Sequence, residues 1–360
     1  MSLVAAPLPT EVPAKKMTPL NTNVRKHLSQ QHAALLAFWT GDGQRPQASI
    51  ENHCDMVYSL FLLGDLDDVS PSAVDAFCEL AAKTRLPGWK TTEVLEEGIS
   101  VHNCAYLFGT LNLLGTRFPG LYAKVLAGRT FFLAELADPQ TLRPVFSAKW
   151  AHHNWRVSHW IGGVPSILVS LEANVPHLLP RTGLAAGCRD AVDALMDPRT
   201  GLLRAYRSDL LQKLFRIAYG LRHAPDLGDM GGVAHVLWVD HVMRRRYMAV
   251  EAIRAEASRL LLGNSPFMEK VPYCLDFDII QALRTAAEQS TPATALERDR
   301  ARALMRSIEA FFESPSEGYT LHKIPGALAT HHECALLVET SNSPASGGEP
   351  LDVIKAANWL

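Results

Sequence analysis

Two carboxylates at the start of one apolar segment are the sharpest chemical signal in the sequence. Asp276 and Asp278 come directly before an apolar, helix-like run at 279–287. Acidic side chains are favoured in the first turn of a helix, where backbone N–H groups lack partners, so helix capping is one interpretation. A carboxyl group in an apolar cavity instead has a raised pKa and can act as a general acid or base. Both are candidate catalytic residues, and we expect Asp278 to enter the cavity because residues two apart do not share a helix face.

A dense group of histidines is the second signal. His153 and His159 lie in a segment that also contains Arg156 and Trp160 and leads into a Gly-Gly-Val-Pro junction. Histidine is the common acid–base residue near neutral pH. We therefore expect His153 and His159 to be catalytic and Arg156 and Trp160 to bind substrate, although purely structural histidines are an open alternative. No short metal-binding motif such as H-E-x-x-H is present, so no cofactor is expected, with a divalent metal held by histidines as the minor alternative.

The remaining candidates mostly share one position, the polar start of an apolar segment. On this basis we expect seven further residues to bind substrate: Asn52, His53, Asp55, His102, Asn103, His235 and Tyr273. For His235 a packed core histidine is the alternative. We further expect His153, His159, His235 and Asp278 to lie in one funnel, on the side where the inner helices begin.

Alternation of two kinds of helical segment predicts the fold. Segments that are apolar around their whole circumference begin near Asn52, His102, His159, Gly232, Asp278 and Ala327. Amphipathic segments lie between them. A helix that is apolar all round is normally buried, and a one-sided helix normally covers it. We therefore predict an all-α fold, an (α/α)6 toroid of helical hairpins around a central funnel. An open helical solenoid is the competing architecture.

The domain organisation follows from composition along the chain. We predict one toroid domain at 26–339, a flexible Pro-rich N-terminal tail at 1–25 and a flexible C-terminal tail at 340–360. The last residues, 353–360, could dock back onto the domain as a short hook.

The bulk composition excludes several classes of partner. The 360 residues are 48% hydrophobic and 20% charged, with a net charge of −2, which is typical of a soluble globular protein. This charge does not favour nucleic acid or an anionic membrane surface, and no apolar run is long enough to span a membrane. The N-terminus lacks the apolar core of a signal peptide, and the six cysteines form no C-x-x-C pair. We expect free thiols and a cytoplasmic location, and make no prediction of oligomeric state.

A family resemblance rests on three of these segments. The stretch Leu275-Asp-Phe-Asp-Ile-Ile-Gln-Ala-Leu283 resembles the D-x-D-D segment of class II terpenoid cyclases, although Ile279 stands where the family has its final Asp. The turn at 197–202 and the Gly-rich stretch at 229–235 are also similar to the terpenoid cyclase and prenyltransferase toroid. The resemblance implies that Asp278 matches the family's proton donor. It also implies lyase or isomerase chemistry, including cyclisation, on an isoprenoid-like or other small organic substrate.

Two other functions remain open. A carbohydrate-active (α/α)6-barrel hydrolase, lyase or epimerase would have many aromatic residues around its funnel, and aromatic residues make up only 8% of this chain. A non-catalytic α-toroid binding protein is the other. An apolar funnel with one carboxyl group favours the cyclase-like enzyme. An aromatic and polar funnel with two carboxyl groups favours the carbohydrate-active enzyme, and a filled funnel favours the binding protein.

Overall fold

The computed structural model describes ten parts of the chain: 18–41, 43–86, 99–129, 154–203, 209–218, 220, 225–267, 271–316, 318–339 and 350–360. Within them the secondary structure is helical, apart from one isolated bridge between Met196 and Leu203. The all-α prediction is confirmed for these residues. No helix in them is long and apolar enough to cross a membrane. All six cysteines are free, as expected.

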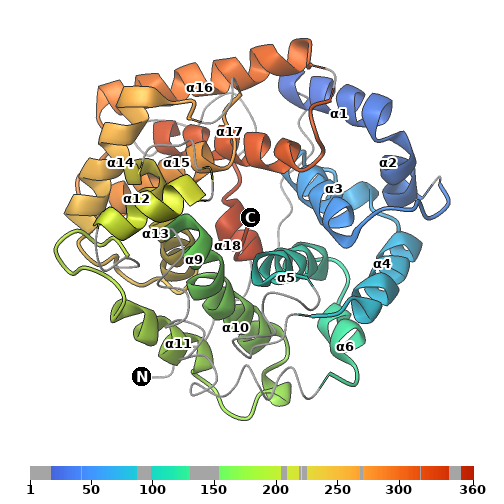
Figure 1. The fold of residues 1–360 in the computed structure, drawn as a ribbon. Coiled ribbons are helices and arrows are strands. Elements are labelled where there is room, and N and C mark those ends of the chain that lie inside the picture. The colour runs from blue at the N-terminus through green and yellow to red at the C-terminus, as the bar shows by residue number, and fades with distance from the viewer. Residues whose placement is uncertain are drawn as a thin grey trace.

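Seven helices form the inner part of the molecule (Figure 1): α3 (Ile50–Leu62), α5 (Val101–Gly115), α9 (Asn154–Ile161), α10 (Gly163–Asn174), α13 (Pro225–Val242), α15 (Leu275–Gln289) and α17 (Lys323–Glu339). They contact one another in a circuit: α3 packs on α5, α5 on α10, α10 on α9, α9 on α13, α13 on α15, α15 on α17, and α17 on α3. On α15, every residue from Leu275 to Ala287 is buried. The segments predicted to be apolar all round are therefore the ones that the structure buries.

The amphipathic segments cover this inner circuit from outside. They form α1 (Pro19–Gln31), α2 (Ala33–Thr40), α4 (Pro71–Lys83), α6 (Leu121–Leu126), α11 (Leu184–Asp193), α14 (Val250–Asn264) and α16 (Ala295–Glu313). A further helix, α12 (Asp209–Ala218), exposes Leu210, Leu214 and Ile217. The helix α14 packs on α15, α16 on α17, and α11 on α10. Arg254 of α14 makes two 2.9 Å hydrogen bonds to Glu297 of α16, and Glu297 also completes a capping box with Thr294. This contact fixes the two outer helices to each other.

Three predicted boundaries and one predicted segment need correction. The N-terminal tail does not extend to residue 25, because α1 begins at Pro19, with Thr18 as its N-cap. Proline, taken as a sign of a tail, here occupies the first helical turn, where its missing N–H costs nothing. The third inner segment is two helices, α9 and α10, separated at Gly162. The helices α13 and α17 begin earlier than Gly232 and Ala327, at Pro225 and Lys323.

The last residues of the chain are packed inside the circuit of inner helices. The short helix α18 (Val353–Ala357) contacts α5 and α13, and Trp359 beyond it is fully buried. The hydroxyl of Tyr58 donates a 2.6 Å hydrogen bond to the carbonyl of Trp359. The hook expected at 353–360 is thus present, and this stretch is not a flexible tail. Residues 340–349 lie outside the described residues.

Candidate functional site

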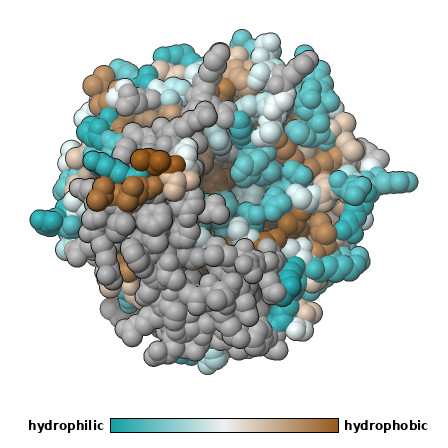
Figure 2. Space-filling view, viewed as in Figure 1, coloured by the Kyte–Doolittle hydropathy of each residue, from teal (hydrophilic) through white to brown (hydrophobic). Residues whose placement is uncertain are grey.

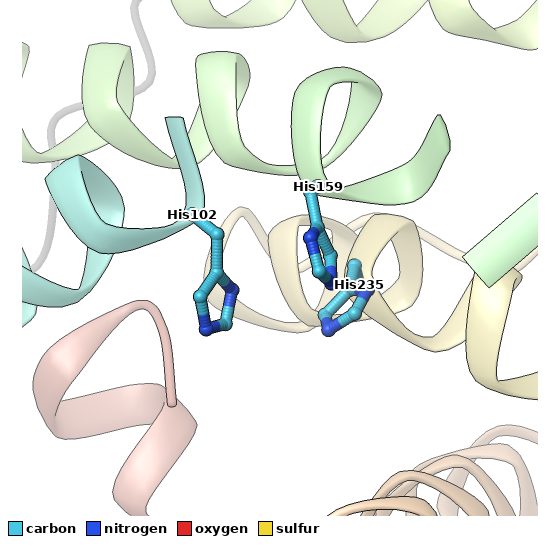
Figure 3. Close-up of side chains that lie close together, drawn as sticks. All are labelled: His102, His159 and His235. Carbon is cyan, nitrogen blue, oxygen red and sulfur yellow. The ribbon is translucent and has the colours of Figure 1, made fainter. Parts of the chain in front are cut away.

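Three histidines from three inner helices converge on one point. His102 comes from α5, His159 from α9 and His235 from α13, and one ring nitrogen of each lies within 4.8 Å of the other two (Figure 3). The rings of His102 and His159 are stacked with centroids 4.6 Å apart. The ring of His159 meets that of His235 edge-on at 5.3 Å. His235 is buried, while the other two are partly exposed, so the group can be reached from outside.

Local sequence explains how these rings come together. Ser100 caps α5 by accepting a hydrogen bond from the backbone of Asn103, which places His102 in the first turn. His159 lies in the last turn of α9, close to Gly162. A Cβ atom on Gly162 would lie 2.7 Å from the backbone oxygen of His235, so glycine is what lets α9 and α13 approach this closely. The expectation that all these side chains lie at helix starts is wrong for two of them, because His159 ends α9 and His235 is within α13.

Two hydrogen bonds orient the rings. The Nδ1 atom of His235 lies 2.6 Å from Oγ of Ser158. The indole N–H of Trp359 donates a 3.1 Å hydrogen bond to Nδ1 of His102. The neutral His102 ring therefore carries its own proton on Nε2. Burial, together with the nearby His102, holds the pKa of His235 well below its usual value, so this ring is neutral at physiological pH.

A second polar group surrounds Asp55 on α3. This carboxylate is 1% exposed, and its Oδ1 atom accepts 3.0 Å hydrogen bonds from the Tyr106 hydroxyl and from Nδ1 of His322. The His322 side chain is 64% exposed. Its pKa is raised, mainly by the hydrogen bond to Asp55 and further by the charges of Asp55 and Glu51. A buried carboxylate thus fixes the orientation of an accessible imidazole and stabilises its protonated form.

The two groups are neighbours. The Tyr106 ring lies between them, with its centroid 6.4 Å from that of His102 and 6.4 Å from that of His322. Nearby, Nδ2 of Asn103 donates a 2.6 Å hydrogen bond to Oε1 of Glu51, which links the starts of α5 and α3. Figure 2 shows one face of the molecule, which is hollowed near its middle, with hydrophobic residues in the depth and hydrophilic ones along one side.

The two aspartates in the first turn of α15 have different surroundings. Asp276 accepts a 2.5 Å hydrogen bond from the hydroxyl of Ser265 and a 3.4 Å one from the backbone N–H of Phe267, so it holds the loop before α15. Burial raises its pKa to about 6. Asp278 is 2% exposed, and its Oδ2 atom has no hydrogen-bond partner in the described structure. Burial, and next the charge of Asp276, raise the pKa of Asp278 well above its usual value.

The structure therefore brings together two of the four residues that were predicted to share one funnel. His159 and His235 lie together and are joined by His102, whereas Asp278 does not belong to the converging group found among the described residues. His153 lies outside the described residues. A catalytic role for Asp278 stays a prediction.

The other predicted substrate-binding residues have mixed positions. His53 does not face the site; its ring packs against Phe38, Trp39 and Phe77, towards α2 and α4. Burial lowers the pKa of His53 to about 4. His53 does lie near the start of its helix, as predicted, but its neighbours on the outer helices decide which way its ring points.

Three further residues of the predicted set lie near helix starts or in the core. The backbone N–H of Asn52 donates to Oγ of Ser49, the cap of its own helix. Trp160 is buried, and the ring of Tyr273 lies 5.6 Å below the Lys323 ammonium group. Nothing is described of the Arg156 side chain.

Sequence reasoning missed His322, Tyr106, Ser158 and Trp359. His322 comes directly before the sixth apolar segment, so the rule of polar residues at segment starts would have found it if the start had been placed at Lys323. Tyr106 lies one turn after His102 on the same helix face. Trp359 carries no local signal, because its position depends on docking of the chain end.

Comparisons of the chain with family models, with curated proteins and with solved structures gave no significant match. The function must therefore be inferred from the geometry of the two polar groups.

Proposed function

We propose that this protein is an enzyme in which Asp55 and His322 act as an acid–base pair on a small organic substrate. One observation carries the proposal: a buried carboxylate holds Nδ1 of an imidazole whose side chain is 64% exposed. With the Nδ1 proton directed at Asp55, the basic nitrogen of neutral His322 is Nε2. His322 would accept a substrate proton there and later return it, while Asp55 stabilises the imidazolium form.

The remaining residues have supporting roles in this proposal. The Tyr106 hydroxyl donates to the same oxygen of Asp55 and keeps the carboxylate in place. The histidines around His102 would line the substrate cavity beyond Tyr106. The circuit of inner helices with outer helices packed on it supports an α/α toroid. The buried chain end inside this circuit favours the non-catalytic alternative, and the Asp55–His322 pair is what favours an enzyme. Because that architecture is also the one implied by the resemblance to terpenoid cyclases, we favour lyase or isomerase chemistry. The free thiols favour a reducing, cytoplasmic setting.

The carbohydrate-active alternative has less support. Sugar-binding funnels need accessible aromatic faces, but Trp238 and Trp359, which lie against His235, are 2% and 0% exposed.

The test combines a substrate screen with two variants. Purified protein is incubated with a panel of isoprenoid diphosphates, small alkenes and carbonyl compounds, and a matched panel of oligosaccharides, and products are detected by mass spectrometry. For any substrate turned over, we expect His322→Gln to lower kcat/KM by about two to four orders of magnitude, the usual contribution of a positioned proton-transfer group. His331→Gln is the matched control, because His331 bonds to Glu309 of the outer helix α16 instead.

The pH dependence gives a second readout. A general base must be deprotonated, so kcat/KM should fall as the pH drops through the raised pKa of His322. In Asp55→Asn the raising hydrogen bond to a carboxylate is lost, and this acidic limb should move to lower pH. The pKa of His322 can be measured independently of any substrate by NMR titration. Turnover that is unchanged in both variants, or an acidic limb that does not move, would refute the proposal.

A further inference from the structure

We propose that His102, His159 and His235 form a binding site for a divalent transition-metal ion, with Zn²⁺ as the preferred occupant. This site is separate from the Asp55–His322 pair and goes beyond the proposed function, because it uses other residues and needs no turnover to be detected. It rests on the convergence of three ring nitrogens within 4.8 Å of one another (Figure 3).

The distances suit a site that closes slightly around its ion. Zinc–imidazole bonds are about 2.0–2.1 Å long, so two nitrogens on a tetrahedral zinc ion lie about 3.4 Å apart. From a triangle with sides of at most 4.8 Å, each nitrogen has to move inward by about 1 Å or less. Side-chain rotation provides such a shift for His102 and His159, which are partly exposed, whereas His235 is buried and fixed.

The donor set selects the class of metal. Three imidazoles with no carboxylate among them suit zinc, copper, nickel or cobalt, and do not suit magnesium or calcium, which prefer oxygen ligands. Three protein ligands also leave the fourth tetrahedral position open to water or a substrate atom, the arrangement of catalytic zinc sites.

The surroundings of His235 support this role. Oγ of Ser158 lies 2.6 Å from Nδ1 of His235 and can accept its N–H, which leaves Nε2 for the metal. Metal-binding histidines commonly donate their second ring N–H to such a partner, which fixes the tautomer and ring orientation. Trp359 stacks on the same ring with centroids 4.9 Å apart and limits its rotation.

His102 makes metal binding depend on the end of the chain. Its Nδ1 atom accepts the indole N–H of Trp359, so in this arrangement Nε2 carries a proton and cannot bind a metal. The metal must therefore displace this hydrogen bond: either it takes Nδ1, or the ring proton moves to Nδ1 and the metal takes Nε2. Both routes leave the buried indole N–H without its acceptor. Metal affinity and the attachment of Trp359 thus oppose each other at His102.

The experiment measures metal binding by the full chain after treatment with a chelator. Zn²⁺ is titrated calorimetrically, and Co²⁺ is titrated as a probe whose visible absorption reports tetrahedral coordination. We expect about one ion per chain in the wild type, and a loss of affinity of about a hundredfold or more in His102→Gln and in His159→Gln. Ser158→Ala should weaken binding about tenfold, through the loss of the partner that orients His235.

Two further variants test whether Trp359 competes with the metal for His102, and whether this site is independent of the Asp55–His322 pair. Trp359→Phe keeps an aromatic ring beside His235 but removes the competing N–H, and we expect it to bind metal about tenfold more tightly. Asp55→Asn should bind metal as the wild type does, so failure of the acid–base proposal leaves this one intact, and the reverse also holds. Absence of binding in the wild type, or binding that persists in both His102→Gln and His159→Gln, would overturn the inference.

Discussion

At the scale of single residues, burial decides what each ionisable group can do. Asp55 and Asp278 are both almost fully buried, but Asp55 accepts two hydrogen bonds from side chains, whereas Oδ2 of Asp278 has none among the described residues. Desolvation without compensating partners raises the pKa of Asp278 well above its usual value and so favours its neutral form. A sequence indicates that both are acidic, but the number of donors that surround each carboxyl depends on residues far away in the chain.

The raised pKa of Asp278 predicts a pH-dependent stability difference. In the unfolded chain this carboxyl ionises above pH about 4, whereas in the folded protein it stays protonated to a much higher pH. The folded state therefore loses stability relative to the unfolded state as the pH rises from about 4 through the raised pKa. Asp278→Asn removes this loss, so we expect the stability of the variant relative to the wild type to increase as the pH rises above about 4, by about 1.4 kcal/mol per pH unit until the raised pKa is reached.

Urea unfolding of both proteins at several pH values checks this. Asp276, whose pKa is about 6, contributes a loss of the same sign in both proteins, so the difference between the curves reports Asp278 together with its coupling to the Asp276 charge. Parallel stability curves for wild type and variant would contradict a raised pKa for Asp278.

Activity of the same variant tests the cyclase-like role. A fall in kcat/KM of about two to four orders of magnitude would identify Asp278 as the general acid. Near-normal turnover would leave it a structural residue.

At the scale of elements, the sequence predicts which helices are buried better than it predicts how they meet. Apolar residues around the whole circumference identify α5 and α15 as inner helices, because this property belongs to each segment by itself. Contacts between helices are not local. The Gly-Gly-Val-Pro junction is visible in the sequence. The break between α9 and α10 and the close approach of α9 to α13 also depend on His235, which lies on the other helix of the contact.

The glycine at this junction gives an element-scale prediction. In Gly162→Ala the new Cβ would lie 2.7 Å from the backbone oxygen of His235, and backbone cannot rotate away. We expect α9 to be pushed from α13, with a destabilisation of about 1–3 kcal/mol and weaker metal binding, because His159 moves from His235.

A second glycine serves as the matched control. Gly187 lies on the outer helix α11, is exposed, and has nothing within 4 Å of the position of its Cβ. Gly187→Ala should therefore stabilise the protein by about 0.5–1 kcal/mol through helix propensity. Thermal denaturation and metal titration of the two variants compare them directly, and equal effects at both positions would show that the contact between α9 and α13 is not tight.

At the scale of the whole molecule, the C-terminal residues connect several of the inner helices. Asp352 accepts hydrogen bonds from Arg284 on α15 and pairs with His241 on α13, while Arg284 also binds Glu333 on α17. Beyond this network, Trp359 reaches His102 on α5. Composition predicts a flexible tail because 340–350 is rich in Ser, Gly and Pro. The short apolar stretch that follows can be recognised as a hook, but its docking site is formed by helices more than a hundred residues earlier.

Removal of this chain end is the prediction for the whole molecule. A chain truncated after residue 350 loses the buried side chains of Val353, Ile354 and Trp359 and leaves Arg284 without one of its carboxylates. Each buried apolar side chain contributes about 1.5–3 kcal/mol, so the truncation should cost several kcal/mol, a large part of the stability of a typical domain.

Lys355→Ala, which changes an exposed residue of α18, is the control and should be close to neutral. Chemical unfolding measures the cost. A truncated chain that unfolds at the same urea concentration as the full chain would show that α18 is not needed for the fold.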